Sequence, residues 1–100
     1  MRSLFRRTSV SVERARELLA EGWQLVDVRT AKEWKSDHVT GALHIPLDTL
    51  DRSLGRLRKS DSLVTICHSG MRSAVAARTL RGNGWNAVTV RGGMMAWRRK

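Results

Sequence analysis

The amino-acid sequence predicts a single α/β domain in which a mainly parallel β-sheet lies between layers of helices. Its 100 residues are enough for one domain and too few for two, and 41% apolar with 28% charged residues is ordinary for a globular protein. Four short apolar runs alternate with segments of helical periodicity, which is typical of βα units. No repeat or linker interrupts residues 1–100, and residues 1–8 are a candidate flexible basic segment.

The first third of the chain predicts a helix, a buried strand and a shorter helix. Ser11 is a good N-cap for a helix whose apolar residues return on one face, and Gly22 ends that helix. Residues 25–28 are apolar except for one Asp, and they predict a short buried strand. Thr30 can then cap a short helix that runs through Trp34.

The middle of the chain predicts further strands on either side of a helical segment. Residues 42–45 form a short apolar strand that ends at Pro46, because proline lacks a backbone donor. Residues 48–58 carry leucines at helical spacing and predict a helix. A polar turn follows, and residues 63–66 predict a third strand that runs directly into Cys67.

The last third of the chain repeats the alternation of helix and strand. Ser73 begins an Ala-rich helix with one apolar face, and the Gly-Asn-Gly of residues 82–84 closes it. Residues 87–90 predict the fourth strand, and residues 94–97 predict a final helical turn. Strands separated by helices in this way are expected to be parallel neighbours in one sheet.

Cys67 is the only cysteine, and this excludes several classes of protein. One thiol cannot form an internal disulfide or a multi-thiolate zinc site, so the disulfide-rich secreted class and the zinc fingers are excluded. No apolar run approaches the roughly 18 residues that span a bilayer, and no signal-peptide stretch follows the basic start. We therefore expect a cytoplasmic protein with no membrane span in this chain.

The chain is strongly basic, and its charges are unevenly distributed. Nineteen Lys and Arg residues against nine Asp and Glu give a net charge of +10. All nine acids lie in residues 1–61, whereas residues 62–100, which include Cys67, hold seven bases and no acid. Such a segment attracts anions, but no recognised nucleic-acid-binding motif is present, so no nucleic acid is expected as a partner. An acidic partner protein could dock on the basic termini: Arg2, Arg6, Arg7, Arg91, Arg98, Arg99 and Lys100.

The segment that follows the third predicted strand carries the chemistry. In open parallel sheets, ligands bind at the carboxyl ends of the strands, and Cys67 lies in such a strand-to-helix loop. A thiolate there is stabilised by loop N–H groups, by the positive end of the helix dipole and by the Arg72 guanidinium. We therefore predict that the pKa of the Cys67 thiol lies below the free value of about 8.5.

The spacing of the loop suits a small oxyanion. Arg72 lies five positions after Cys67, so the loop can curl until the guanidinium and the amides face one small space above the sulfur. Gly70 supplies the backbone freedom for so tight a curl, because other residues resist positive φ. The hydroxyls of Ser69 and Ser73 can add hydrogen bonds.

The sequence resembles the rhodanese family of sulfurtransferases, in its single-domain form, over nearly the whole chain. Four blocks occur in the family's order. Residues 25–29 with Glu33 and Trp34 match a DVR…E(Y/F/W) block, and residues 38–47 resemble the family's HIPGAxxIP block. The loop of residues 67–72 matches the Cys, four residues, Arg signature, and residues 91–97 match the terminal GGxxAW.

The resemblance implies a rhodanese-like three-layer fold, a five-stranded parallel sheet flanked by helices, and a ping-pong sulfur transfer without cofactor or metal. Cys67 would attack the outer sulfur of a donor such as thiosulfate, sulfite would leave, and the persulfide would pass its sulfur to cyanide or a thiol. The same resemblance makes the amides of residues 68–72 the anion cradle. The predicted substrate-binding residues are Arg72, His68, Ser69, Gly70, Met71 and Ser73.

Some residues have a simpler structural interpretation. Asp27, Arg29 and Glu33 can form a network that supports the fold, including an Arg29–Glu33 pair four positions apart. His38 and His44 lack the Cys or carboxylate partners of a metal site, so core or turn roles are expected. His68 can tune the thiolate, contact substrate or be a solvated loop residue.

The alternatives are a small-anion phosphatase or arsenate reductase and a non-catalytic basic docking domain. The family's phosphatase and arsenate-reductase relatives carry one more residue between Cys and Arg, so the short loop favours sulfur transfer. A docking domain that had lost catalysis would be expected to lack the Cys. Asp37 and Thr40 replace the family's usual Gly and Pro, and we expect local turn changes there.

Overall fold

The computed structural model describes residues 8–99, and a five-stranded sheet forms its centre. All paired strands are parallel, in the order β1-β5-β4-β2-β3. The strands are β1 (Ser9–Val10), β2 (Gln24–Asp27), β3 (Leu43–His44), β4 (Ser62–Ile66) and β5 (Asn86–Val90). The predicted fold class is confirmed; the candidate flexible segment 1–8 lies outside the described residues except for Thr8.

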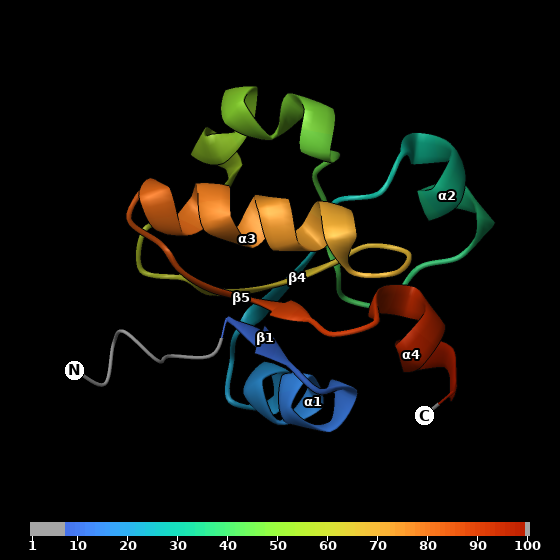
Figure 1. Ribbon diagram of the computed structural model, residues 1–100. Helices are drawn as coiled ribbons and strands as arrows, with labels where there is room; N and C mark the ends of the chain where they lie inside the picture. Colours follow the sequence, from blue (N-terminus) through green and yellow to red (C-terminus); the bar gives the residue numbers. More distant parts are fainter. Residues whose placement is uncertain (1–7, 100) are drawn as a thin grey trace.

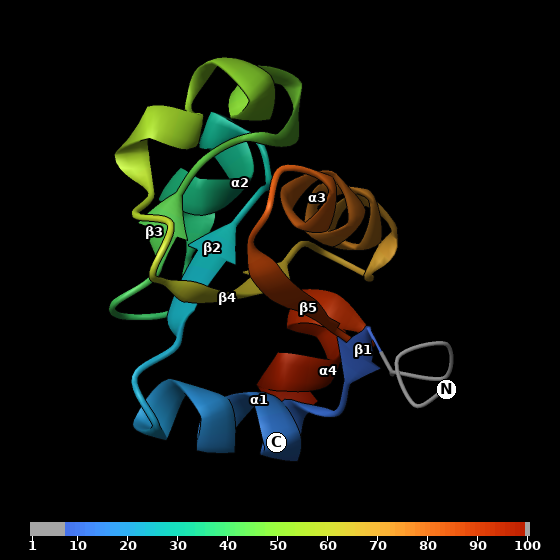
Figure 2. The same cartoon turned by 90° about the vertical axis from the view of Figure 1, so that its left-hand side faces the viewer.

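Helices cover both faces of the sheet (Figure 1). The α-helices are α1 (Val12–Ala20), α2 (Ala31–Ser36), α3 (Met71–Gly82) and α4 (Gly93–Arg99), and the 3-10 helices are η2 (Leu47–Arg52) and η3 (Leu54–Arg56). Helix α3 and the 3-10 helices lie on one face, and α1 and α4 lie on the other (Figure 2). The short helix α2 lies beside the edge strand β3, where Trp34 stacks on His44.

Two hydrophobic cores, one on each face of the sheet, hold the layers together. Successive residues of a strand point to opposite faces, so β4 contributes to both cores. Leu63 packs with the α3 core, as does Cys67 just after the strand, whereas Val64 and Ile66 pack with the α1 and α4 core. The alternation therefore places the Cys67 side chain on the α3 side of the sheet.

The segment predicted as a helix over residues 48–58 is instead a pair of 3-10 helices. Its hydrogen bonds run from residue i+3 to residue i, as from Ser53 N–H to the Leu50 carbonyl, and such helices are short. The leucine spacing still marks the buried side, because Leu50 and Leu57 are buried. The spacing of the leucines predicted which residues are buried, but it did not distinguish an α-helix from 3-10 helices.

Other elements also differ from the sequence prediction, most of them by one or two residues at an end. Strand β1 was not predicted from periodicity, because two residues are too few to show an alternation. The strand predicted at 42–45 shrinks to β3. Helix α3 begins at Met71 and not at Ser73, because Gly70 adopts a left-handed N-cap conformation with φ 114°. Arg72 therefore belongs to the first turn of α3.

Candidate functional site

Cys67 lies at the carboxyl end of β4, where the chain turns through a short loop into α3 (Figure 1). Its side chain is buried, and its residue is 1% exposed. The sulfur accepts two backbone hydrogen bonds, from Gly70 N–H at 3.1 Å and from Ser73 N–H at 3.3 Å. The loop therefore wraps around the sulfur and presents donors to it, as the sequence predicts.

Hydrogen bonding overrides burial in setting the charge of the sulfur. Burial alone raises the pKa of the Cys67 thiol, because it disfavours the charged form. The hydroxyl and N–H of Ser73, followed by the N–H groups of Gly70 and Ser69, lower that pKa by stabilising the thiolate. The net result is a pKa below the ordinary value, in the predicted direction.

The Ser73 hydroxyl belongs to a buried chain of hydroxyl groups. Its oxygen accepts a hydrogen bond from Thr89 Oγ1 at 2.7 Å, and its own proton can point to the Gly70 carbonyl at 3.3 Å or to the sulfur. Thr65 Oγ1 donates to the Ser73 carbonyl at 2.7 Å and fixes the first turn of α3. Ser73 is 0% exposed, so the structure places it beneath the sulfur and not on the solvent side of the loop.

Helix α4 holds the other side of the loop. The N–H of Met94 donates to the Cys67 carbonyl at 2.7 Å, and the N–H of Met95 donates to the His68 carbonyl at 3.0 Å. Gly93 permits this approach, because a Cβ there would overlap both carbonyl groups and lie 2.6 Å from His68 O. With the carbonyls turned toward α4, the amides that follow can turn toward the sulfur.

Arg72 makes a bidentate ion pair that the sequence did not predict. Its Nη1 and Nη2 donate to Glu33 Oε1 and Oε2 at 2.7 and 2.9 Å. Glu33 is itself fixed as the capping-box residue of α2, and it accepts from Thr30 N–H and Oγ1. The ion pair therefore ties the first turn of α3 to the start of α2 and determines where the Arg72 guanidinium lies.

The charges of this pair are strongly stabilised. The hydrogen bonds from Arg72, and then those from Thr30, outweigh burial and lower the pKa of Glu33 to about 2. The pKa of Arg72 is raised, mainly by Glu33 and further by the Cys67 thiolate. The positive charge of Arg72 is therefore stabilised by Glu33 first and by the sulfur anion to a lesser degree.

The expected Arg29–Glu33 pair is wrong, because each residue has a different main partner. Arg29 is almost fully buried and donates from Nε and Nη2 to the carboxylate of Asp27, which is also buried, at 2.8–3.1 Å. Arg29 Nη2 also donates to the Asp37 carbonyl at 2.7 Å. Asp27 and Arg29 therefore support the fold, as expected, while Glu33 turns toward the site.

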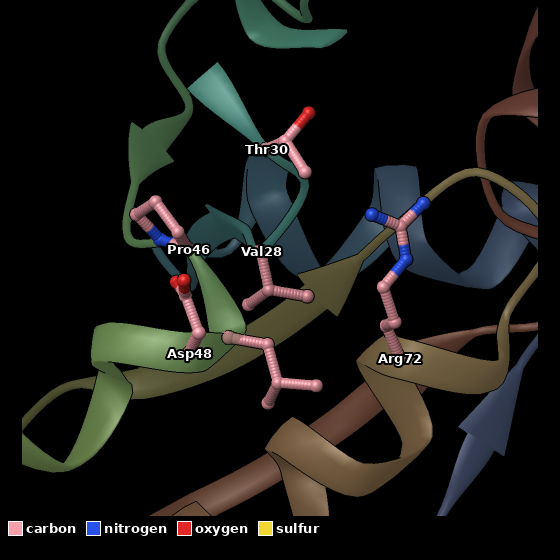
Figure 3. Close-up of a pocket in the computed structure, with 6 residues that line it drawn as sticks. Val28, Thr30, Pro46, Asp48 and Arg72 are labelled. Atoms are coloured by element: carbon pink, nitrogen blue, oxygen red, sulfur yellow. The ribbon is translucent and has the colours of Figure 1, made fainter. Parts of the chain in front are cut away.

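A pocket of about 260 Å³ opens beside Arg72 (Figure 3). Its lining combines the carboxyl end of β2, the chain after β3 and the start of α3: Val28, Thr30, Pro46, Leu47, Asp48 and Arg72. Most of the wall is apolar, and the Arg72 side chain stands on one side of the pocket across from Asp48 (Figure 3). The pocket lies over strand ends where parallel sheets bind ligands.

The remaining predicted site residues lie on the outer side of the loop. His68 and Ser69 have exposed side chains, and only their backbone groups take part in the hydrogen bonding described above. Met71 is 80% exposed at the start of α3. The structure thus brings Gly70 and Ser73 to the sulfur, and it leaves His68, Ser69 and Met71 facing solvent.

Residues 8–99 contain neither a cluster of metal-ligating side chains nor a helix that could span a membrane. That part of the chain contains no group of three or more His, Cys, Asp or Glu side chains arranged to hold a metal ion. His38 and His44 instead stack on Trp34. No helix in the same part of the chain is long and apolar enough to cross a membrane.

Known proteins resemble this chain in both sequence and structure. The Rhodanese-like domain family matches residues 11–100. Thiosulfate sulfurtransferase GlpE of Pseudomonas savastanoi pv. phaseolicola (strain 1448A / Race 6) is 33% identical over 87 residues, which are 86% of this chain and 82% of GlpE. The structure of human single-domain sulfurtransferase TSTD1 superposes with a TM-score of 0.86 at 29% identity, covering 95% of this chain and 98% of TSTD1.

Other relatives are longer than this chain. YrkF of Bacillus subtilis (strain 168) is 38% identical over 78 residues, which are 77% of this chain but 42% of YrkF. The chain spans about half the length of several curated relatives that it matches, between 42% and 60% in three of them. The match in those proteins therefore concerns one part of a larger molecule.

Proposed function

Because this chain belongs to the rhodanese-like domain family, we propose that it is a sulfurtransferase that carries a sulfane sulfur as a persulfide on Cys67. The observation that supports this most is the buried sulfur, which accepts the N–H groups of Gly70 and Ser73 within one short loop. These donors favour a thiolate, and the thiolate is the nucleophilic form of cysteine. Relatives named as thiosulfate sulfurtransferases suggest thiosulfate as a donor.

The first half-reaction is a displacement at sulfur. The Cys67 thiolate attacks the outer sulfur of thiosulfate, a new S–S bond forms, and the bond between the two thiosulfate sulfurs breaks. Sulfite leaves with the electron pair of that bond. Cys67 then carries a persulfide whose terminal sulfur holds the negative charge.

The second half-reaction returns the enzyme to its starting state. A thiolate or a cyanide ion attacks the terminal sulfur of the persulfide and takes it away as a new persulfide or as thiocyanate. The Cys67 thiolate is the leaving group, so the hydrogen bonds that lower its pKa also make it a better leaving group. No electrons are gained or lost over the cycle, and no cofactor or metal enters either step.

Two features of the site suit an anionic donor. The Arg72 guanidinium lines the pocket and keeps N–H groups beyond the two that Glu33 binds, since a guanidinium has five. We infer that the amides of residues 68–72 supply further donors around the sulfur, since those of Ser69 and Gly70 already stabilise its anion. In this proposal the donor's oxyanion lies between Arg72 and these amides, and His68, Ser69 and Met71 contact it or its surroundings from the outer side.

The free Cys67 thiol also favours a reducing cellular compartment. Cys67 is a free thiol with a lowered pKa, and such a thiol persists in a reducing compartment. We therefore place the proposed activity in the cytoplasm, with a small thiol, cyanide or a protein cysteine as acceptor.

Intact-protein mass spectrometry after incubation with thiosulfate tests the proposal. We expect a gain of one sulfur atom that is absent in Cys67→Ser and that cyanide removes with the release of thiocyanate. Ser60→Ala is the matched control, because Ser60 is exposed and precedes β4 at the opposite end of that strand from Cys67, and this variant should load normally. If no sulfur is gained while the protein hydrolyses a phosphate ester or, with a thiol reductant, reduces arsenate, the proposal is wrong and the small-anion alternative holds.

A further inference from the structure

The large apolar side chains that residues 8–99 leave exposed gather around the Cys67 loop. They are Met71, Val75 and Met95, which are 80%, 43% and 45% exposed. Met71 and Val75 lie in the first turns of α3, directly after the loop, and Met95 lies in the first turn of α4. Both helices meet at the loop (Figure 1). Exposed apolar residues scattered singly need no explanation, but a group around a reactive sulfur does.

On helix α3, a positively charged residue follows the exposed apolar residues. Met71, Val75 and Arg78 are spaced by four and three residues, so they share one face of the helix. All three side chains are exposed. At 1.5 Å per residue, Arg78 lies roughly 10 Å from Met71 along the helix axis. This face thus presents two apolar residues at the end of α3 that adjoins the loop and a cation about one turn further along the helix.

Helix α4 has the same arrangement. Met95 and Arg99 are four residues apart on one exposed face. The N–H of Met95 bonds to the His68 carbonyl, so this face is fixed relative to the loop. Two helices from different parts of the chain therefore each place a Met beside the loop and an Arg one or two turns beyond it.

The charges of these two faces are not neutralised within residues 8–99. No ion pair among those residues includes Arg78 or Arg99. Residues 62–100 contain no acidic side chain at all. Methionine adapts to irregular apolar surfaces, and arginine is enriched in protein interfaces. An acidic surface with apolar residues is complementary to both components.

We propose that two exposed helix faces that start at the loop, together called the Met–Arg face, dock one acidic protein segment that carries a cysteine. The two faces consist of Met71, Val75 and Arg78 of α3 and of Met95 and Arg99 of α4. This inference rests on the proposed function and names the sulfur acceptor. The partner's thiolate attacks the terminal sulfur of the Cys67 persulfide, the S–S bond to Cys67 breaks, and the Cys67 thiolate leaves. The partner then carries the persulfide.

Nucleic acid fits the Met–Arg face less well than protein does. Binding of single strands relies on exposed aromatic side chains that stack with bases. Trp85 is buried, and Trp97 packs in the α1 and α4 core beneath Arg16. The exposed large apolar residues around the loop are methionines and a valine, which suit a protein surface.

Transfer to model peptides tests the acceptor. The probes are a short peptide with a central Cys between Glu and Leu residues and a peptide with Lys in place of each Glu. We expect persulfide-loaded protein to pass its sulfur to the acidic peptide about tenfold faster, with the preference shrinking at high salt. Arg78→Glu and Arg99→Glu should each remove most of that preference and leave transfer to cyanide unchanged.

Arg58→Glu is the matched control for these charge reversals. Arg58 is 85% exposed and precedes β4, so it lies at the opposite end of that strand from Cys67. It should keep the preference for the acidic peptide. Equal rates for the acidic and basic peptides, or the same loss in Arg58→Glu as in Arg78→Glu, would overturn the proposal.

A binding measurement separates this proposal from the proposed chemistry. The acidic peptide with Ser in place of Cys is titrated into ¹⁵N-labelled protein, which needs no sulfur transfer. We expect the amide signals of Val75, Arg78 and Met95 to shift, and the shifts to disappear in Arg78→Glu. Shifts confined to other parts of the molecule contradict docking here, whatever the outcome of the thiosulfate experiment. Docking shifts in a protein that forms no persulfide would instead contradict only the sulfurtransferase function.

Discussion

The two sides of the Cys67 loop are built in different ways. The inner side consists of backbone N–H groups, buried hydroxyls and carbonyls held by α4, and nearly every group there has a partner. The outer side consists of exposed side chains, among them His68 and Met71. The inner side therefore determines the charge of the sulfur, while the outer side is free to determine which molecules reach it.

The largest expected effect comes from crowding the inner side at Gly93. Gly93→Ala should destabilise the fold by about 2 kcal/mol, because the new Cβ overlaps the Cys67 and His68 carbonyls and the backbone has φ 55°. Persulfide formation should fall by more than the loss of folded protein explains. Gly55→Ala is the control, since a Cβ there meets open space. Denaturant unfolding and thiosulfate loading measure both effects, and equal behaviour of the two variants contradicts the account.

The next effect concerns the charge of the sulfur. Ser73→Ala removes the hydroxyl that favours the thiolate, so the pKa of Cys67 should rise and alkylation near neutral pH should slow several-fold. Thr89 Oγ1 can still donate to the Thr65 carbonyl, so the fold should lose little stability. The rate of reaction with iodoacetamide as a function of pH measures the change. An equal shift in Ser69→Ala would show that the inner hydroxyl has no special role.

The Glu33–Arg72 ion pair joins the start of α2 to the first turn of α3. Breaking it should reduce activity less than the Gly93 and Ser73 substitutions do. Glu33→Gln leaves Arg72 without its bidentate partner and weakens the capping box of α2, at a cost of about 1 kcal/mol. We expect a several-fold higher KM for thiosulfate with little change in kcat, because Arg72 still carries its charge but is less well positioned. Glu17→Gln on α1 is the control, and a drop in kcat alone is the contradicting result.

The same pair predicts a small pH effect on stability. The pKa of Glu33 is lowered to about 2 in the folded protein, against 4.5 for the free group, so the unfolded chain binds the proton more readily. The stabilisation from Glu33 is therefore complete above about pH 4.5 and is lost as the pH falls toward 2. The stability difference between the unmodified protein and Glu33→Gln should shrink over that range in urea unfolding. A stability difference that stays constant down to about pH 2 would contradict the lowered pKa of Glu33.

Local patterns predicted much of the fold and the inner side of the loop. Apolar runs located β2, β4 and β5, and the Gly70 position after Cys67 indicated the left-handed turn that the structure contains. These features depend on neighbours a few positions apart, which a sequence displays directly. The position of Cys67 at the end of a buried strand followed in the same way.

Contacts between distant segments could not be predicted from local patterns. Glu33 was expected to pair with Arg29 four positions away, but it binds Arg72, which is 39 positions away. The approach of Gly93 to the Cys67 carbonyl likewise depends on how α4 packs against the loop. The spacing of Thr30 and Glu33 fits a capping box, and this is a local signal that Glu33 has a fixed position.

The pH dependence of Cys67 alkylation in the unmodified protein tests most directly whether the inner side makes a thiolate. The reaction rate with iodoacetamide follows the ionised fraction of the one cysteine, so its midpoint reports the pKa of that thiol. We expect a midpoint below the free-cysteine value of about 8.5, because the loop donors stabilise the thiolate. A midpoint at or above that value would contradict the claim that the loop stabilises the sulfur anion.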